Sequence, residues 1–377
     1  MLRTLLIFGF TLAVSTGRAQ DISQVVYRSG DCGYACFRIP AIVRAADGTL
    51  LAFAEARRDG TADKGDIDLV LRRSADGGRT WGELVVVWDD ADNTCGNPAP
   101  VVLHDTGRIV LLATWNRGED HERDIERGRT ADTRRVFVLA SDDCGRTWSE
   151  PREITSEVKR AGWTWYATGP CHAIVKSRAP HKGRILVPAN HKFVAPDGSV
   201  ASHSHLIYSD DRGETWRLGA VSQPGGNESS VAELSDGSVM LNMRHYDRQD
   251  SLRLCAVSRD GGHTWSETWE ETQLVEPRCQ GSLLNYAPAV ERSSRTLLFS
   301  NPRSLRRENL SLGVSRDDGR TWSRFVTIWP GRAAYSDLVR LADGSIGVLY
   351  ENGDPGGKEE LYKRITFGTV SPEELFD

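Results

Sequence analysis

The sequence predicts an all-β protein, a six-bladed β-propeller with four antiparallel strands in each blade. Two repeated patterns lead to this prediction. The phrase Ser-x-Asp-x-Gly-x-Thr-Trp occurs five times at intervals of 67, 68, 49 and 57 residues, and such spacing indicates an array of similar units. A short apolar run, a turn and a second apolar run recur six times, and such pairs are typical of β-hairpins.

Each eight-residue phrase, called a box below, has the composition of a tight turn between two strands. The aspartate can accept hydrogen bonds from backbone N–H groups two residues on. The glycine adopts a positive φ readily, and the tryptophan buries a large apolar surface. The boxes are therefore predicted to be structural turns rather than parts of a site. They cover residues 74–81, 141–148, 209–216, 258–265 and 315–322.

The hairpins give the number of blades. They are predicted at residues 40–53, 99–113, 172–189, 230–242, 287–300 and 336–350. After each of the first five, two further short strands enclose one box, and four-stranded sheets repeated radially form a propeller. The sixth hairpin has no box. We expect its two missing strands to come from the chain ends, at residues 25–27 and 365–369, which would leave no free sheet edge.

The first twenty residues differ from the rest of the chain. Arg3 precedes the apolar run LLIFGFTLAV, and small residues follow as far as Ala19 and Gln20, which is typical of a secretory signal peptide. The apolar run of about ten residues is too short to span a bilayer, and no later segment approaches that length. We expect residues 1–20 to be removed on export to the periplasm or the medium, and residues 21–377 to form the propeller.

Charge and cysteine content disfavour several classes of function. Loss of Arg3 and Arg18 would change the formal net charge from −5 to −7, and an acidic chain argues against nucleic acid as a partner. The seven cysteines permit disulfides in an exported protein but leave one cysteine over. They form no Cys-x-x-Cys pair, so we expect no zinc site.

The strand order predicts where a site would lie. The strands of a blade alternate in direction, so the start of the innermost strand and the end of the next lie on the face opposite the boxes. Arg38, Arg244 and Arg303 occupy such positions in three blades. Converging guanidiniums repel one another unless an anion lies between them, and their planar forks fit a carboxylate or a phosphate. The sequence therefore predicts an anion site on this face.

The motifs resemble those of the sialidase (neuraminidase) family, and of bacterial exo-α-sialidases most closely. Phe37-Arg38-Ile39-Pro40 is similar to the family's Phe-Arg-Ile-Pro motif, and the boxes are similar to its Asp boxes, or BNR repeats. The resemblance implies the six-bladed sialidase propeller. It also implies a retaining exo-α-sialidase, without a cofactor, that removes terminal sialic acids from glycoproteins, gangliosides and oligosaccharides through a covalent sialyl-tyrosine.

The resemblance further implies roles for single residues. Tyr335 would be the nucleophile, Glu228 the carboxylate paired with it, and Asp63 the acid/base, with Asp59, Asp66 and Asp68 as rivals of Asp63. The carboxylate of sialic acid would be bound by the arginine triad predicted above. The implied supporting residues are Glu351, which would steady Arg38, and Arg57 in the pocket.

Two stretches on the same face would form the pocket wall. Residues 114–135 are predicted to be a long loop in which Asn116 and Arg117 contact the N-acyl group, and residues 161–170 precede the third blade. Trp165 and Tyr166 would cover the glycerol tail or the leaving sugar, because aromatic faces suit the apolar face of a sugar and loops carry substrate-specific contacts. A solvated charged loop with core aromatics explains the same residues equally well.

The nucleophile type follows from the charge of the substrate. Sialic acid carries a carboxylate on its anomeric carbon, so a carboxylate nucleophile would meet like charge where a phenol would not. Sialyl transfer to a sugar and intramolecular release of an anhydro sugar stay open beside hydrolysis. The complete catalytic set argues against two other classes, a non-catalytic sialoglycan-binding propeller and a structural propeller.

Overall fold

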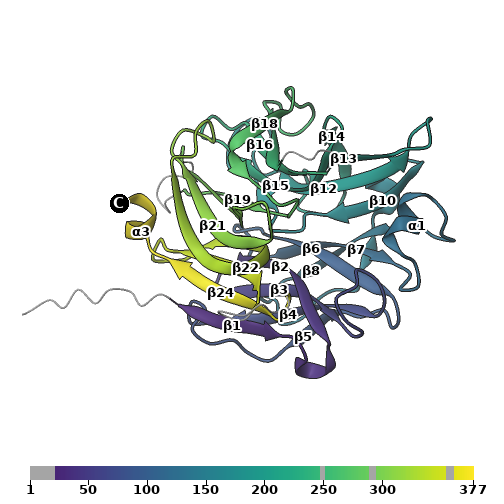
Figure 1. Ribbon diagram of the computed structural model, residues 1–377, viewed down its shortest axis with the longest axis horizontal. Helices are drawn as coiled ribbons and strands as arrows, with labels where there is room; N and C mark the ends of the chain where they lie inside the picture. The colour runs from purple at the N-terminus through teal and green to yellow at the C-terminus, as the bar shows by residue number, and fades with distance from the viewer. Residues whose placement is uncertain (1–21, 247–250, 288–293, 354–360) are drawn as a thin grey trace, which may run out of the picture.

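The computed structural model describes residues 22–246, 251–287, 294–353 and 361–377, so the predicted signal peptide lies outside the described residues. Within them strands dominate and helical segments are short, which confirms the all-β class (Figure 1). No helix of the described chain is long and apolar enough to cross a membrane. The helical segments are the 3-10 turn η1 (Asp31–Gly33), α1 (Glu122–Glu126), α2 (Thr155–Val158) and α3 (Pro372–Phe376).

The strands of the described chain fall into six successive antiparallel groups. The first two groups are β2 (Cys36–Arg44), β3 (Leu50–Arg57), β4 (Ile67–Ser74) and β5 (Val85–Trp88), then β6 (Thr94–Val102), β7 (Ile109–Asn116), β8 (Arg135–Ser141) and β9 (Arg152–Glu153). The third and fourth are β10 (Trp163–Thr168), β11 (Ile174–Val175), β12 (Ile185–Val194), β13 (Val200–Ser209) and β14 (Arg217–Val221), then β15 (Gly226–Glu233), β16 (Val239–His245), β17 (Leu252–Ser258) and β18 (Trp269–Val275). The last two share β22 (Arg324–Arg340) and contain β19 (Ser282–Asn285), β20 (Leu297–Pro302) and β21 (Glu308–Ser315), then β23 (Ile346–Asn352), β24 (Arg364–Val370) and β1 (Ser23–Arg28).

Hydrogen bonds join these groups into four sheets of eight, five, four and seven strands over the described residues, and these sheets do not close into one ring. The eight-stranded sheet joins the first two groups through a single parallel pairing of β4 with β6. The seven-stranded sheet joins the last two groups through β22, whose first half pairs with β21 and whose second half pairs with β23. The third and fourth groups are separate sheets.

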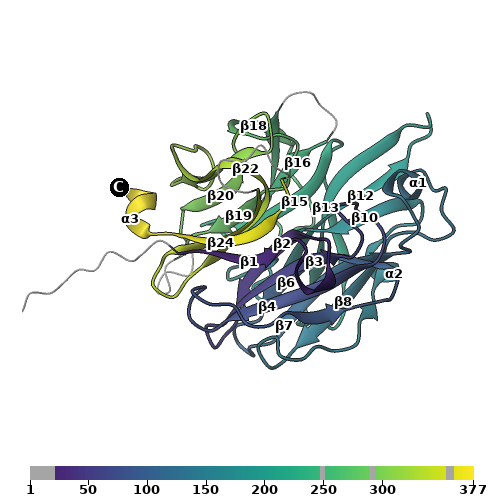
Figure 2. The same ribbon diagram turned by 60° about the horizontal axis from the view of Figure 1, so that its bottom comes forward.

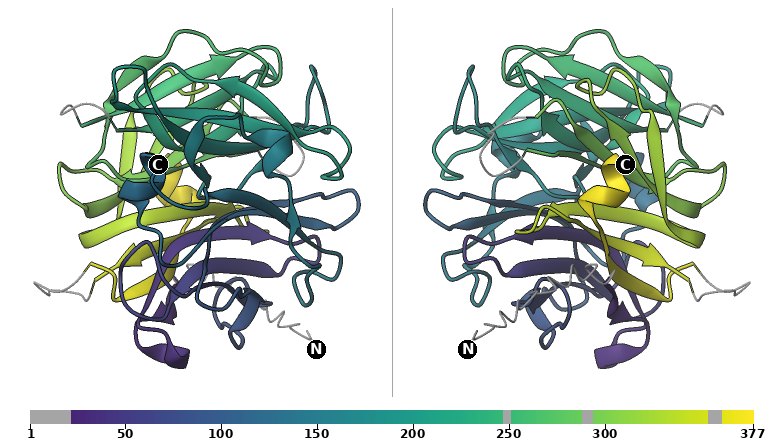
Figure 3. Two further views of the ribbon diagram at one scale, coloured as in Figure 1. Left: turned by 90° about the vertical axis from the view of Figure 1, so that its right-hand side faces the viewer. Right: turned by 90° about the vertical axis from the view of Figure 1, so that its left-hand side faces the viewer.

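Both chain ends contribute strands to the last group, as expected, but β1 is an edge strand of its sheet, so a free edge remains over the described residues. β1 runs antiparallel to β24, with Val25 opposite Thr366, and the two strands lie side by side in Figures 1 and 2. The last group therefore takes one strand from the start of the chain and three from its end. The helix α3 follows β24 and lies on the outside of the molecule (Figure 3).

Two predicted hairpins differ from the structure. The fifth was predicted from residue 287, but its first strand is β19, which ends at Asn285; residues 288–293 lie outside the described residues. In the third group an extra strand, β10, pairs with β12 beside the short predicted strand β11. The other four hairpins are present as antiparallel pairs.

The apolar core lies between consecutive groups rather than at one centre. One buried cluster joins the first and second groups, and further clusters join each group to the next. A sixth cluster joins the last group to the first, with Tyr27 and Phe367 packed beside Ile42 and Val70. Each strand group is thus packed against the next.

The boxes are turns, as predicted, but the aspartate accepts its backbone hydrogen bonds from residues three and four positions on rather than two. In the first box Thr80 donates to Asp76 from its N–H (3.0 Å) and its hydroxyl (2.6 Å). Gly78 has a φ of +93°, and a Cβ there would lie 2.1 Å from the ring of Phe367. The box therefore needs glycine both for its backbone conformation and for its close packing on the neighbouring group.

A buried carboxylate links four of the six groups. Asp337, on β22, is fully buried. It accepts hydrogen bonds from the N–H of Ile42 (2.9 Å), from the N–H of His172 (2.9 Å) and from the hydroxyl of Ser282 (2.7 Å). His172 also contacts it through Nδ1 at 2.7 Å. These partners belong to the first, third and fifth groups, so Asp337 ties the innermost strands together.

The disulfides that the sequence permitted are not formed. All seven cysteines are unbonded, and five of them are buried. The nearest pair in sequence is unbonded too, with Cys32 in η1 exposed and Cys36 on β2 buried. Packing rather than covalent linkage holds the sheets together.

The second box offers a test of this structural role. In it Asp143 accepts hydrogen bonds from the N–H of Arg146 (2.9 Å) and from the N–H (2.9 Å) and hydroxyl (2.7 Å) of Thr147, and these bonds hold the pKa of Asp143 below its ordinary value. We expect Asp143→Ala to lower the free energy of unfolding by about 1–3 kcal/mol. The exposed neighbour Asp142 provides the matched control, Asp142→Ala.

The difference between the two variants should depend on pH. A carboxylate whose pKa is lower in the folded state stabilises the fold above its unfolded pKa of about 4 and loses that effect as pH falls through the folded value. The difference in unfolding free energy between Asp143→Ala and wild type, measured by denaturant titration, should therefore be largest at pH 7 and shrink below about pH 4. Equal unfolding free energies for both variants at pH 7 would contradict the structural role.

Candidate active site

A cavity of about 320 Å³ opens on the face away from the boxes. It is lined almost entirely by polar and charged side chains from several strand groups. Among them are the predicted Arg38, Arg57, Asp63, Trp165, Glu228, Arg244 and Tyr335, together with Glu55, Asn97, Arg134, Asn227, Arg307 and Tyr362. Residues far apart in sequence therefore meet in one cavity.

Irregularities in four strands aim side chains at this cavity. A register shift, or bulge, bends a strand and changes where its side chains point. Ile39 at the first bulge has a φ of +58°, an unusual value for a β-branched residue, and Asn97 at the second has a φ of +54°. The shifts lie between Arg38 and Ala41, Gly96 and Ala99, Gly226 and Ser229, and Ala333 and Ser336.

Glu351 holds the first of these bulges in place, as predicted for the partner of Arg38. Its fully buried carboxylate accepts hydrogen bonds from Arg38 Nε (3.1 Å) and Nη2 (3.3 Å) and from the N–H of Ile39 (2.8 Å). It also accepts one from the N–H of Tyr335 (3.2 Å). One carboxylate thus fixes both an arginine side chain and the backbone of the candidate nucleophile.

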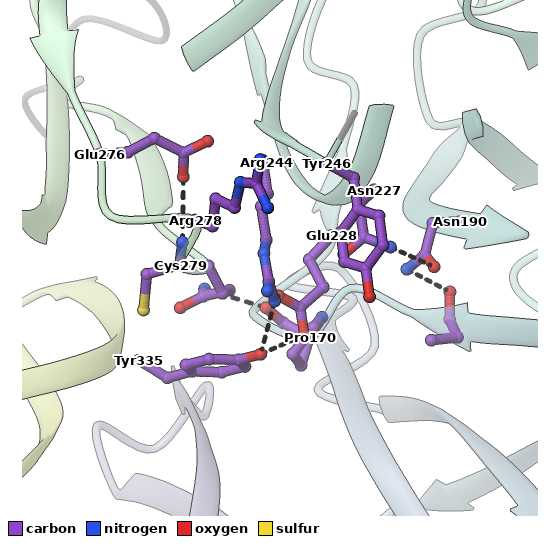
Figure 4. Close-up of polar contacts among 12 residues, drawn as sticks. Pro170, Asn190, Asn227, Glu228, Arg244, Tyr246, Glu276, Arg278, Cys279 and Tyr335 are labelled. Atoms are coloured by element: carbon purple, nitrogen blue, oxygen red, sulfur yellow. Dashed lines mark hydrogen bonds and ion pairs between the residues drawn. The ribbon is translucent and has the colours of Figure 1, made fainter. Parts of the chain in front are cut away.

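Tyr335, Glu228 and Arg244 form a connected triplet (Figure 4). The hydroxyl of Tyr335 donates to Glu228 Oε1 at 2.5 Å, and Arg244 Nη1 donates to Glu228 Oε2 at 2.7 Å and to the Tyr335 oxygen at 3.2 Å. Tyr335 is 6% exposed. Its pKa is raised well above its ordinary value, first by burial and then by the charge of Glu228. The phenol is therefore neutral and already bonded to a base.

Asp63 lies at the mouth of the cavity between two arginines. Its carboxylate is 2.7 Å from Arg57 Nη2 and 3.3 Å from Arg38 Nη1, while the side chain stays 56% exposed. Burial raises its pKa, but the charges of Arg57 and Arg38 outweigh burial and lower the pKa to about 2. Arg57 is itself paired with Glu55 at 2.6 Å.

The rivals of Asp63 do not reach the cavity. Asp68 is buried and accepts hydrogen bonds from the hydroxyl of Tyr34 and from Arg58. Asp66 is paired with Arg58 at 3.4 Å, and Asp59 is an exposed residue beside Gly65. Asp63 is thus the carboxylate of this segment that lines the cavity.

The structure does not bring Arg303 into the cavity. Its guanidinium lies on the surface, 3.9 Å from the ring centre of Phe325. Arg307, four residues later in the same connection, lines the cavity instead, with its guanidinium carbon 5.5 Å from the ring centre of Tyr335. It donates to the hydroxyl of Tyr362 at 2.6 Å. Arg38, Arg244 and Arg307 therefore surround Tyr335.

The predicted pocket wall is present only in part. Trp165 lines the cavity, but its neighbour Tyr166 is fully buried in the core, where its hydroxyl bonds His205 Nε2 at 2.7 Å. Successive side chains of a strand point to opposite faces, so both residues of β10 could not face the cavity. Asn116 is buried with its amide donating to the carbonyl of Arg117, and it does not line the cavity.

Several lining residues were not among the predicted site residues, and four of them are charged: Glu55, Glu122, Arg134 and Arg307. Arg134 ends the loop predicted at residues 114–135, and Glu122 of α1 lies within it. The only sequence signal for Arg134 was the high density of charged residues in that loop. Such a signal does not show which arginine points into the cavity. For Arg307, the segment after β20 contains three arginines, Arg303, Arg306 and Arg307, for a single place in the triad.

The described residues contain no cluster of histidine, cysteine and acidic side chains able to hold a metal ion.

Comparisons with known proteins agree with this geometry. A family model described as a BNR repeat-like domain matches residues 48–348. The sialidase of Micromonospora viridifaciens is 34% identical over 86% of this chain, and this chain spans 51% of that protein. Mouse Sialidase-3 is 31% identical, with 94% of this chain and 96% of the relative covered. Among solved structures, the Hadza microbial sialidase Hz136 is 30% identical with a TM-score of 0.81, covering 94% of this chain and 69% of that one.

The matches to mouse Sialidase-3 and to Hz136 each cover 94% of this chain. The chain belongs to the sialidase family.

Proposed function

We propose that this protein is an exo-α-sialidase that hydrolyses terminal α-linked sialic acids with retention of configuration, through a covalent bond to Tyr335. The observation that carries the proposal is the 2.5 Å hydrogen bond from the Tyr335 hydroxyl to Glu228, made beside Arg244. A buried phenol joined to a base is an activated nucleophile. Cleavage of a fluorogenic aryl α-sialoside, with free sialic acid rather than an anhydro sugar as the product, would test the proposal.

The three arginines determine the class of substrate. Arg38, Arg244 and Arg307 would bind the carboxylate that sialic acid carries on its anomeric carbon. This places that carbon next to the oxygen of Tyr335, and fixing reacting atoms in contact lowers the barrier entropically. The substrates would be sialylated glycoproteins, gangliosides and oligosaccharides. With Arg307 in place of Arg303, the sequence supplies all three arginines of the triad.

The first chemical step would form the sialyl-tyrosine. The phenolic oxygen of Tyr335 bonds to the anomeric carbon while Glu228 takes its proton, and the bond to the leaving glycan oxygen breaks as Asp63 protonates that oxygen. In the second step Asp63 removes a proton from water, the water oxygen bonds to the anomeric carbon, and Tyr335 leaves and regains its proton from Glu228. Two displacements at one carbon retain its configuration.

Asp63 needs a proton for this role, although its pKa is about 2 in the free protein because of Arg57 and Arg38. A substrate carboxylate bound to Arg38 would offset part of that positive charge. The pKa of Asp63 would then rise, since a nearby cation favours the charged carboxylate and its neutralisation removes that effect. Substrate binding would thus prepare the acid.

The scaffold and location belong to the same proposal. We infer that the six strand groups are the blades of a six-bladed propeller, a view supported by the buried clusters between successive groups and between the last and first. Residues 21–377 would form this catalytic domain. Residues 1–20 would act as a signal peptide, and the mature enzyme would work in the periplasm or outside the cell.

Replacing the nucleophile tests the first step. Tyr335→Phe keeps the ring and removes the attacking oxygen, so hydrolysis should fall by about three orders of magnitude or more. Tyr286→Phe is the matched control, because it also removes a phenolic hydroxyl, one bonded to the carbonyl of Gly344 away from the cavity. Near wild-type turnover by Tyr335→Phe in steady-state assays would rule out the sialyl-tyrosine.

The acid/base assignment can be separated from binding by varying the leaving group. Asp63→Ala should lower kcat/KM by about 10²–10⁴-fold on sialyllactose, whose leaving sugar needs a proton. On an aryl sialoside with an acidic phenol the loss should be much smaller, because that phenol leaves unprotonated. An equal loss on both substrates would instead mean that Asp63 acts through Arg38 and Arg57.

The third arginine can be identified by two parallel substitutions. Arg307→Lys keeps the charge but loses the planar fork, and we expect kcat/KM to fall about tenfold or more. Arg303→Lys, on the surface beside Phe325, should leave kcat/KM within about twofold of wild type. The reverse order of these effects would restore Arg303 to the triad.

A further inference from the structure

Arg134 lines the cavity without a bonding partner. Arg38, Arg57 and Arg244 each pair with a carboxylate within 3.1 Å. The guanidinium of Arg134, in contrast, makes no hydrogen bond or ion pair with any residue that the structure describes, and its buried Nε is left unsatisfied. The residue is only 4% exposed. A nearly buried cation thus faces the cavity unpaired.

The surrounding structure nevertheless holds Arg134 firmly. Its guanidinium carbon lies 4.1 Å from the ring centre of Trp165, a stacking distance. The ammonium of Lys159 donates to the carbonyl of Arg134 (2.7 Å), to the hydroxyl of Thr133 (2.6 Å) and to the carbonyl of Thr164 (3.0 Å). The backbones that carry Arg134 and Trp165 are therefore tied together, and the guanidinium is positioned before any ligand arrives.

Such an arrangement destabilises the free protein. A buried charge without hydrogen-bond partners costs free energy, and burial accordingly lowers the pKa of Arg134. The cost is removed when a bound molecule supplies an oxygen acceptor. Preorganised but unsatisfied donors of this kind are what a binding site needs, because they lose little entropy when the ligand binds.

The local charges select a neutral acceptor. Glu55, Glu122 and Asp63 line the same cavity, and their negative charges act on Arg134, opposed in part by the charge of Arg57. A second anionic group on the ligand would share the cavity with these three carboxylates and be repelled by them. A carbonyl or hydroxyl oxygen avoids that repulsion while still accepting a charge-assisted hydrogen bond, which is stronger than a neutral one.

We propose that Arg134 is a specificity-determining residue that binds a neutral oxygen, carbonyl or hydroxyl, on a ring substituent of the substrate, while Arg38, Arg244 and Arg307 bind the carboxylate. This inference rests on the proposed sialidase function and extends it to the opposite side of the sugar. Trp165, stacked on Arg134, would support the same substituent. Arg134 takes no part in bond making, so its contribution is to binding.

The test compares Arg134→Met, which keeps the length and the contact with Trp165, against wild type on three aryl α-sialosides. One carries all substituents, one has hydrogen in place of the acylamino group, and one has a shortened glycerol chain. On the complete substrate kcat/KM should fall about tenfold or more, mainly through a higher KM. On whichever analogue lacks the bound oxygen, the variant and wild type should agree within about twofold.

Arg135→Met is the matched control, because Arg135 is already paired with Asp132 and Glu153 and does not line the cavity. It should leave all three activities unchanged. An equal loss by Arg134→Met on every substrate would overturn the proposal and make Arg134 a structural residue.

A second readout does not depend on activity. Because Arg134 is a buried unpaired charge, Arg134→Met without ligand should melt at or above the wild-type temperature. A fall of several degrees would overturn the proposal. If wild type cleaves none of the three sialosides, the proposed function fails, and the melting comparison then decides whether Arg134 is a ligand-facing charge or a structural one.

Discussion

The site depends on one buried carboxylate, that of Glu351. Four hydrogen bonds reach it, from the guanidinium of Arg38 and from the N–H groups of Ile39 and Tyr335. A fully buried charge is tolerated only when it is paired and bonded in this way. It also stabilises the unusual backbone of Ile39, whose positive φ costs free energy that the rest of the strand must offset. Without Glu351, the side chain of Arg38 and the backbone of Tyr335 would lose the partner that fixes both of them.

The same device recurs across the cavity. Glu55 bonds Arg57 through Oε2 and the N–H of Asn97 through Oε1 (2.9 Å). Asn97, like Ile39, has a positive φ at a bulge. In both cases an acidic residue on the second strand of a group stabilises a bulge on an innermost strand and orients an arginine. The site is thus built by repeating one local solution in neighbouring strand groups, which suits a chain made of repeated units.

Much of the fold follows from local sequence signals, whereas the site follows from them less completely. Turn residues and apolar runs mark strands whatever their neighbours, so the boxes, four of the six hairpins and the pairing of β1 with β24 were predictable. The resemblance in motifs singled out Tyr335, Glu228 and Asp63, and the structure brings all three to one cavity. Arg303 lies outside the cavity because the chain travels four further residues before it turns inward at Arg307.

The remaining error concerns side-chain direction. A register shift between Trp163 and Tyr166 decides which residue of β10 faces the cavity, and the sequence carries no mark of that shift. Long-range packing of Tyr166 against His205 settles it. Charged loops have the same limitation, since Arg134 and Arg135 are adjacent and alike in sequence, yet Arg134 is buried and Arg135 only half-buried.

The pairing of β1 with β24 has a consequence for the order in which the molecule can be completed during synthesis. Chains emerge from the ribosome from the amino terminus at about 5–20 residues per second. The strand Ser23–Arg28 is therefore among the first segments to appear, yet its partner, Arg364–Val370, is among the last. For tens of seconds the first strand lacks the neighbour that covers one of its two edges. The final sheet, and with it the cluster between the last and first groups, is completed only after nearly the whole chain has been translated.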